Sequence, residues 1–243
     1  MNTNAKHLFF DVDNTITRSK SPILPEHEAL FVELSKTHDM VIVSGSKQTD
    51  IWGRFTDASK GTFFTLAQNG NYAFDRNKDE LWKRLLSDEQ KRAIYSFIEK
   101  MHAHTHPPVS DEHDLIEDRG CQIAFSFIGH HEKIEIKEQF DPTMAVRLQI
   151  LSDLKEDVQR LSDDFGIEMA IGGTTNIDIY LKGKHKGFNS KALCELQGWN
   201  IEDTLYFGDL LMPGGNDYTV VGILPTQPVK DYKETYEFLK HFR

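Results

Sequence analysis

The stretch Leu8-Phe9-Phe10-Asp11-Val12-Asp13-Asn14-Thr15 places two carboxylates directly after an apolar run. A continuous apolar run is typical of a buried strand in a parallel sheet. A carboxylate at the end of such a strand loses hydration, so a pair usually needs a metal ion or a proton. If the strand ends at Asp11, Asp11 and Asp13 extend in the same direction. The stretch predicts Mg²⁺-assisted phosphoryl transfer to a carboxylate nucleophile; a solvated strand-to-turn junction is the alternative.

The composition is that of an ordinary globular protein, with 243 residues, 39% hydrophobic and 27% charged. This length fits one large domain or a core with a smaller inserted domain. The net charge of −10 argues against a nucleic-acid or anionic-membrane partner, because either would need a basic face. We therefore expect a small-molecule partner, and a phosphate substrate would need the few Lys and Arg side chains gathered at its site.

Cysteine usage and hydropathy predict the compartment. Cys121 and Cys194 lie far apart in sequence without a CxxC spacing, so we expect neither a disulfide framework nor a zinc site. The N-terminus lacks the apolar segment of a signal peptide, and no apolar run approaches membrane-spanning length. These features predict a soluble, cytoplasmic protein.

Apolar runs followed by turn residues alternate with amphipathic segments at both ends of the chain. The alternation predicts an α/β core with a mostly parallel sheet and right-handed crossovers, formed by residues 1–82 and 183–243. The expected strands are 8–12, 40–43, 62–66, 204–207 and 220–224, and the expected helices are 25–37, 187–197 and 229–242.

The middle of the chain has a different pattern, which predicts an inserted α+β cap over residues 83–182. Residues 88–104 and 144–165 have helical periodicity, whereas 121–128 and 176–181 alternate like half-buried antiparallel strands. Three histidines end the first of these helices: His102, His104 and His106. Their spacing of two puts them on different helix faces, so a solvated helix terminus is favoured over a metal site.

Four polar sites follow predicted core strands or open a core helix, and open α/β sheets bind ligands at the carboxyl ends of their strands. Asp11 with Asp13 is the first. Ser44-Gly45 is the second, and its hydroxyl and backbone could bind phosphate oxygens. Taken alone, Ser44 is better explained as a plain strand-to-helix cap.

Lys186 opens a predicted helix and is the third site. A lysine there could hold two carboxylates and a phosphoryl group together, although a surface lysine is the simple alternative. The fourth is Gly208-Asp209, where Asp209 could complete an oxygen-ligand shell for Mg²⁺. Asn216 and Asp217 could order that shell, or Asp217 could bind Lys186.

Taken in order, these four motifs resemble those of the haloacid-dehalogenase-like (HAD) phosphotransferase superfamily. The resemblance frames almost the whole chain and implies a Rossmann-like core with the cap inserted between the second and third motifs. It also implies Asp11 as a nucleophile that forms a phosphoaspartate, Asp13 as general acid/base and Lys186 as a catalytic residue. Mg²⁺ would be held by Asp11, the Asp13 carbonyl and Asp209.

The segment Gly208-Asp209-Leu210-Leu211-Met212-Pro213-Gly214-Gly215-Asn216-Asp217 is similar to one in eukaryotic-type phosphomannomutases. The cap stretches 116–119 and 125–129 are similar to that family as well. By this resemblance Arg119 would bind the distal phosphate of the substrate from the cap, and Asn176 and Asp178 would bind sugar hydroxyls. Members of the family commonly dimerise through the cap, so a homodimer is a further expectation.

The chain departs from the family at four substrate-binding positions. The family has arginine where this chain has Lys20, His130 and, across a gap, Lys133, and it usually has serine at Asn176. A lysine or neutral histidine does not replace a bidentate arginine clamp. These changes leave two outcomes open: interconversion of mannose 1-phosphate and mannose 6-phosphate, or simple hydrolysis of a sugar phosphate. A non-catalytic phospho-acceptor module ranks third. A P-loop kinase ranks lower still, because this sequence does not contain the G-x-x-x-x-G-K-[ST] motif.

Overall fold

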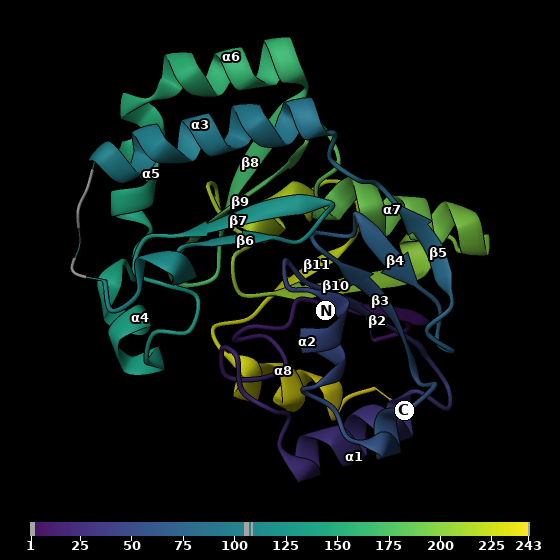
Figure 1. Ribbon diagram of the computed structural model, residues 1–243. Coiled ribbons are helices and arrows are strands. Elements are labelled where there is room, and N and C mark those ends of the chain that lie inside the picture. The colour runs from purple at the N-terminus through teal and green to yellow at the C-terminus, as the bar shows by residue number, and fades with distance from the viewer. Residues whose placement is uncertain (1–2, 105–106, 108, 243) are drawn as a thin grey trace. The chain divides into compact units, whose positions relative to one another are not determined.

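The computed structural model describes residues 3–104, 107 and 109–242. The chain divides into two compact units (Figure 1). The core unit comprises Met1–Lys83 and Lys184–Arg243, and the cap unit comprises Arg84–Gly183. Within the described residues, every helix is too short or too polar to cross a membrane.

The core unit contains a seven-stranded sheet with the order β11-β10-β1-β2-β3-β4-β5. The first five strands in this order run parallel, and β4 and β5 add an antiparallel edge. The strands are β1 (His7–Phe10), β2 (Asp39–Val43), β3 (Phe63–Ala67), β4 (Tyr72–Phe74), β5 (Glu80–Lys83), β10 (Thr204–Gly208) and β11 (Thr226–Pro228).

Two apolar layers cover the two faces of this sheet. Leu8 and Phe10 of β1 pack in one cluster with α1 (Pro25–Leu34), α2 (Gln48–Trp52) and α8 (Tyr232–Leu239). Phe9 points to the other face, where α7 (Lys186–Gln197) packs. Burial on both faces explains the continuous apolar runs, and the predicted α/β class is confirmed.

The position of β1 brings distant parts of the chain to one edge of the sheet. β1 lies between β10 and β2, and Phe10 is in register with Phe207 and Ile42. Because all three strands are parallel, the residues that follow them meet at the same carboxyl edge.

The predicted strand over 220–224 is wrong. Val220 ends a 3₁₀ helix, η4 (Asn216–Val220), and the chain then turns through Gly222, whose φ is 80°. Val220 and Leu224 are buried, which produced the strand-like apolar pattern. The edge strand is instead β11, whose residues are only partly buried and carry little apolar signal.

The cap unit is an α+β structure with a four-stranded antiparallel sheet in the order β6-β7-β9-β8. The strands are β6 (Ile116–Asp118), β7 (Gln122–Ser126), β8 (Ile167–Gly172) and β9 (Asn176–Leu181). The helices are α3 (Asp88–His104), α4 (Ile134–Phe140), α5 (Ala145–Asp153) and α6 (Lys155–Phe165). In Figure 1, α3 and α6 lie side by side over the sheet, and their apolar faces pack on residues such as Ile123 and Ile177.

The single helix predicted over 144–165 is also wrong, because two helices, α5 and α6, meet at Leu154. Leu154 has φ −98° and ψ 21°, its N–H closes α5 on Ile150, and its carbonyl begins α6. The apolar periodicity continues through this break, since Leu154 itself packs on the cap core.

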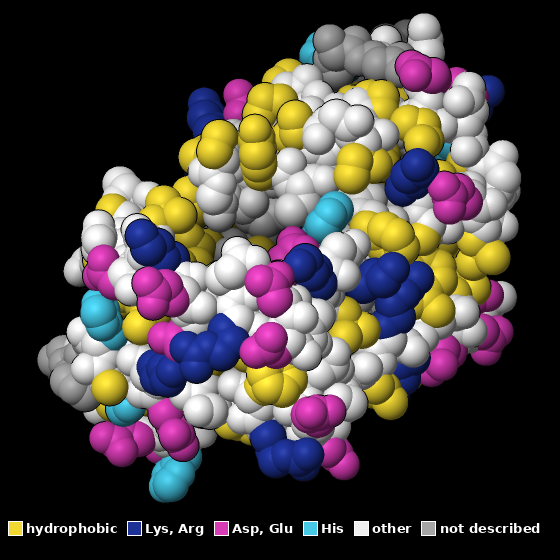
Figure 2. All heavy atoms as spheres, turned by 90° about the horizontal axis from the view of Figure 1, so that it is seen from above, with side chains coloured by type: hydrophobic (Ala, Val, Ile, Leu, Met, Phe, Trp, Pro, Cys, Tyr) yellow, Lys and Arg dark blue, Asp and Glu magenta, His cyan; other side chains and the backbone are white. Residues whose placement is uncertain are grey.

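His104 at the end of α3 lies 2.9 Å from the Asp153 carboxylate, and His106 lies outside the described residues. Cys121 and Cys194 are both free and buried. On the face shown in Figure 2, Lys and Arg side chains alternate with Asp and Glu side chains.

Candidate active site

Lys186 joins two carboxylates in the interior of the core unit. It is the first residue of α7, and its Nζ lies 2.5 Å from Asp11 Oδ1 and 2.8 Å from Asp217 Oδ1. All three residues are buried, and the Lys186 side chain is 1% exposed. A buried ion pair needs further hydrogen bonds to offset its lost hydration, and Lys186 gains them by contacting two carboxylates. The same contacts hold the Asp11 side chain in one position.

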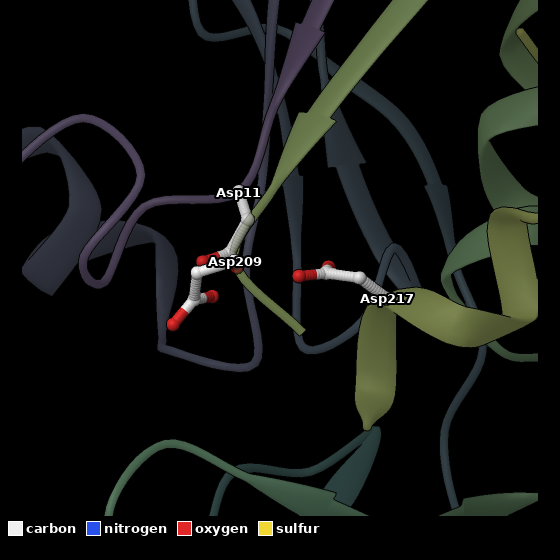
Figure 3. A group of neighbouring side chains, drawn as sticks. All are labelled: Asp11, Asp209 and Asp217. Atoms are coloured by element: carbon white, nitrogen blue, oxygen red, sulfur yellow. The ribbon is translucent and has the colours of Figure 1, made fainter. Parts of the chain in front are cut away.

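A third carboxylate, Asp209, follows β10 at the same edge. Carboxylate oxygens of Asp11, Asp209 and Asp217 lie within 4.8 Å of one another. Figure 3 shows Asp217 pointing toward the other two from η4. Asn14 Nδ2 donates to Asp209 Oδ2 over 3.4 Å from a left-handed turn with φ 61°, a conformation that Asn tolerates well.

The electrostatics of this group indicate excess negative charge. Burial raises the pKa of Asp11 to about 7, because the nearby Lys186 only partly offsets it and Asp217 adds repulsion. Burial and repulsion from Asp11 and Asp217 raise the pKa of Asp209 to about 8. Burial alone would lower the pKa of Lys186, but Asp11 and Asp217 raise it above its ordinary value. Three carboxylates thus face one ammonium, an arrangement that a divalent cation with oxygen ligands fits.

Asp217 is held by donors of the protein itself. The Tyr206 hydroxyl donates to Asp217 Oδ1 over 2.6 Å, and the Leu210 N–H lies 3.3 Å from Oδ2. A Cβ at Gly208 would lie 2.7 Å from Asp217 Oδ2, so this position requires glycine. Asn216 is buried beside it. The structure therefore gives Asp217 the Lys186-binding role, one of the two considered from sequence.

Asp13 lies outside this carboxylate group and has a different partner. Arg54 Nη1 lies 2.8 Å from Asp13 Oδ1 and Nη2 lies 3.5 Å from Oδ2, while the Lys20 N–H donates to Oδ1 over 2.7 Å. Burial raises the pKa of Asp13, but Arg54 and these hydrogen bonds outweigh it and lower the pKa to about 2. The sequence reasoning missed Arg54, because a lone arginine after a short helix belongs to no motif.

Three other predicted residues of the core unit, Ser44, Gly45 and Lys20, flank the same edge. Ser44 follows β2, and its Oγ accepts from the Ser46 N–H over 3.1 Å, so Gly45 sits inside a tight turn. Lys20 has an exposed side chain and a φ of 53°, which turns its amide toward Asp13.

In the cap unit, three of the predicted residues form one charged cluster with Glu117. Arg119 Nε and Nη2 lie 2.9 and 2.7 Å from Glu117 Oε2, and Nη1 lies 3.9 Å from Asp178 Oδ1. His130 is fully buried, with Nδ1 3.9 Å from the same Glu117 oxygen. Glu117 was missed by the sequence reasoning, although its spacing of two from Arg119 on a strand puts both on one face.

Lys133 and Asn176 lie at element ends in the same unit. Lys133 is the exposed N-cap of α4, and Asn176 begins β9 and accepts from the Thr175 hydroxyl over 3.0 Å. The turn before Asn176 is held by Arg147, whose Nη1 donates to the carbonyls of Gly172, Gly173 and Asn176 over 3.1, 3.0 and 3.2 Å. Arg147 is itself paired with Asp141 over 2.8 Å and buried, and its role was also missed.

Comparison with known proteins supplies independent information. A family model described as haloacid dehalogenase-like hydrolase matches residues 8–220. A phosphomannomutase from Spinacia oleracea is 28% identical over 94% of this chain and 93% of the relative. A probable phosphomannomutase from Caenorhabditis elegans is 26% identical over 88% of this chain and 85% of the relative.

Solved structures share the fold at lower sequence identity. A mutant IMP-nucleotidase from Plasmodium falciparum with bound IMP matches with a TM-score of 0.70 and 15% identity, covering 99% of this chain and 68% of that one. A haloacid dehalogenase-like hydrolase from Bacteroides thetaiotaomicron matches with a TM-score of 0.61 and 14% identity, covering 97% and 98%.

Proposed function

The chain belongs to the family of haloacid dehalogenase-like hydrolases, and from that premise we propose that it is a Mg²⁺-dependent phosphotransferase acting on hexose phosphates. The proposed reaction is phosphomannomutase-like and passes through a phosphorylated Asp11. The similarity to phosphomannomutases along nearly the whole chain supports the substrate class.

The proposed chemistry has two half-reactions. In the first, an Asp11 carboxylate oxygen attacks the phosphorus and the bond from phosphorus to the sugar oxygen breaks. Because Arg54 keeps Asp13 ionised in the free protein, Asp13 takes up a proton from the incoming phosphate monoester and passes it to that sugar oxygen. In the second, the ionised Asp13 takes the proton of an acceptor hydroxyl, whose oxygen attacks the phosphorus and releases Asp11. Lys186 holds Asp11 in place and stabilises negative charge at the transferring group.

The metal requirement follows from the charges of the site. Asp11, Asp209 and the Asp13 carbonyl would hold Mg²⁺, with Asp217 kept at Lys186. When bound, Mg²⁺ supplies positive charge that offsets the carboxylates and the phosphoryl oxygens. The raised pKa values of Asp11 and Asp209 support this assignment, because both carboxylates lack sufficient positive charge without a cation.

The observation that carries the proposal is the placement of Lys186 between Asp11 and Asp217, with Asp209 beside them. A site for passive ligand binding would not need a buried carboxylate that is both fixed by a lysine and grouped with two more carboxylates.

A second candidate, a sugar-phosphate phosphatase, is favoured by the charges of the cap unit. Arg119, the predicted ligand of the distal phosphate, already pairs with Glu117 and lies near Asp178. His130 is fully buried, so its ring has no exposed surface to offer a second phosphate. A mutase must bind a bisphosphate in two orientations, and this cluster is poorly suited to a dianion.

A product assay tests both candidates. The chain is incubated with mannose 1-phosphate, Mg²⁺ and a hexose bisphosphate, and free phosphate and mannose 6-phosphate are followed together. Mannose 6-phosphate accumulates if the chain is a mutase, whereas free phosphate accumulates if it is a phosphatase. If neither product forms, the proposal is wrong and a non-catalytic phospho-acceptor remains.

A further inference from the structure

The Arg54 side chain contacts both carboxylate oxygens of Asp13, each through a different guanidinium nitrogen. It follows α2, and its side chain is 7% exposed. Arg54 Nη1 also lies 3.3 Å from the Thr17 hydroxyl oxygen, and its carbonyl accepts from the Ile23 N–H over 2.9 Å. Arg54 therefore holds the loop that follows the nucleophile at three points along its length.

This arrangement differs from a surface ion pair. An exposed pair contributes little because water screens it and both side chains lose freedom. Arg54 is buried, and its planar guanidinium matches the two oxygens of a carboxylate. The Lys20 N–H approaches the same carboxylate from another direction, at the cost of a left-handed backbone. The strained backbone at Lys20 is thus part of what holds the Asp13 carboxylate in one orientation.

We propose that Arg54 is a positioning residue, which fixes the orientation of the Asp13 carboxylate so that it exchanges a proton with the leaving and the accepting oxygen. The inference rests on the phosphotransferase function proposed above. Aspartate has few rotatable bonds but several rotamers, and Arg54 restricts it to one. Misplacement of a catalytic group by about 1 Å can lower the rate by about a hundredfold, so this restriction bears directly on turnover.

The test uses Arg54→Ala and chemical rescue. We expect kcat to fall by about tenfold to a hundredfold with KM changed less than about twofold, since Arg54 acts on Asp13 and not on substrate binding. Added guanidinium chloride, kept below denaturing concentration, should recover part of kcat by entering the vacated space. Arg54→Lys keeps the charge but loses the two-point contact, so it should show a smaller loss and no rescue. It also provides a folded variant if Arg54→Ala is unstable.

Two further variants make the result specific. Arg76→Ala is the matched control, because Arg76 also pairs with an aspartate of the core unit, Asp39, which is the first residue of β2 and lies at the strand end away from the site. It should retain the wild-type kcat and show no response to guanidinium. Arg54→Ala in an Asp13→Asn background should lower kcat no further, because Arg54 acts through Asp13.

The outcomes separate the two proposals. If wild-type enzyme turns over a hexose phosphate but Arg54→Ala keeps its kcat, or loses it additively with Asp13→Asn, the positioning role is wrong while the function stands. A loss confined to KM would also overturn it, because that result assigns Arg54 to substrate binding. A wild-type chain without turnover would overturn the function and this role together.

Discussion

The Lys186 ammonium lies 2.5 Å from an Asp11 carboxylate oxygen, although 175 positions separate these residues in the chain. The parallel pairing of β1 with β10 and the packing of α7 on η4 bring the two together. A Cβ at Gly187 would lie 2.0 Å from the Thr219 carbonyl oxygen, so only glycine lets α7 approach η4 this closely. Lys186 therefore stabilises the packing of the core unit and also holds the proposed nucleophile.

Replacing Lys186 by methionine should therefore cost stability as well as activity. The change leaves Asp11 and Asp217 buried without their cation, and breaking a buried pair in this way costs about 3–5 kcal/mol. Urea unfolding near neutral pH measures the free energy of unfolding. Lys191→Met, on the exposed side of the same helix, is the matched control and should change it by less than about 0.5 kcal/mol. Equal losses in both variants would contradict the structural role of Lys186.

Asp11→Asn should abolish turnover while the protein stays folded. The amide keeps the shape of the carboxylate but is too poor a nucleophile to attack phosphorus. Steady-state assays with a hexose phosphate, together with circular dichroism, measure the two effects. Asp203→Asn is the control, since the Asp203 side chain forms an exposed pair with Lys6. Turnover retained by Asp11→Asn would remove Asp11 as the nucleophile.

The metal-free protein should lose stability as pH rises from about 4 to about 8. The pKa values of Asp11 and Asp209 are raised to about 7 and about 8, against an ordinary value of 3.8. The folded state thus binds more protons than the unfolded state within this window, so rising pH favours unfolding. Below the window both states are protonated and the effect is absent.

Mg²⁺ should reverse this trend, because it binds the ionised carboxylates in competition with protons. The rise in Tm on adding Mg²⁺ should be small near about pH 5 and larger near about pH 8. Differential scanning calorimetry at both pH values measures it, and Asp209→Asn should reduce it. A Mg²⁺ effect independent of pH would argue against these carboxylates as ligands.

Glu117→Gln should strengthen anion binding by the cap unit. The change removes the negative charge that Arg119 now pairs with, leaving its guanidinium more attractive to phosphate. We expect the Kd of a hexose bisphosphate to fall by about tenfold, as one regained charge-assisted contact would give. Isothermal titration measures this, with Glu156→Gln on the exposed side of α6 as control. An unchanged Kd would mean that Glu117 does not limit the anion affinity of Arg119.

The fold class was predictable from sequence because strands of a sheet that is buried on both faces consist of continuous apolar runs, such as 8–12 and 40–43. The wrong strand over 220–224 shows the limit of that signal, since burial of Val220 and Leu224 is compatible with a turn. The residues at strand ends were found because each follows a recognisable element. Arg54, Glu117 and Arg147 could not be found, because their partners depend on tertiary packing and no local pattern marks them.

The position of β1 between β10 and β2 also determines when this enzyme can become functional during its synthesis. β1 and β2 are made early, but the other neighbour of β1 begins only at Thr204, after the whole cap unit. At about 5–20 residues per second, a ribosome needs on the order of 10–40 s to reach it. Throughout that interval one edge of the nucleophile strand has no partner, as in a chain truncated before β10. Nascent and truncated chains should therefore be inactive and depend on chaperones that shield exposed strand edges.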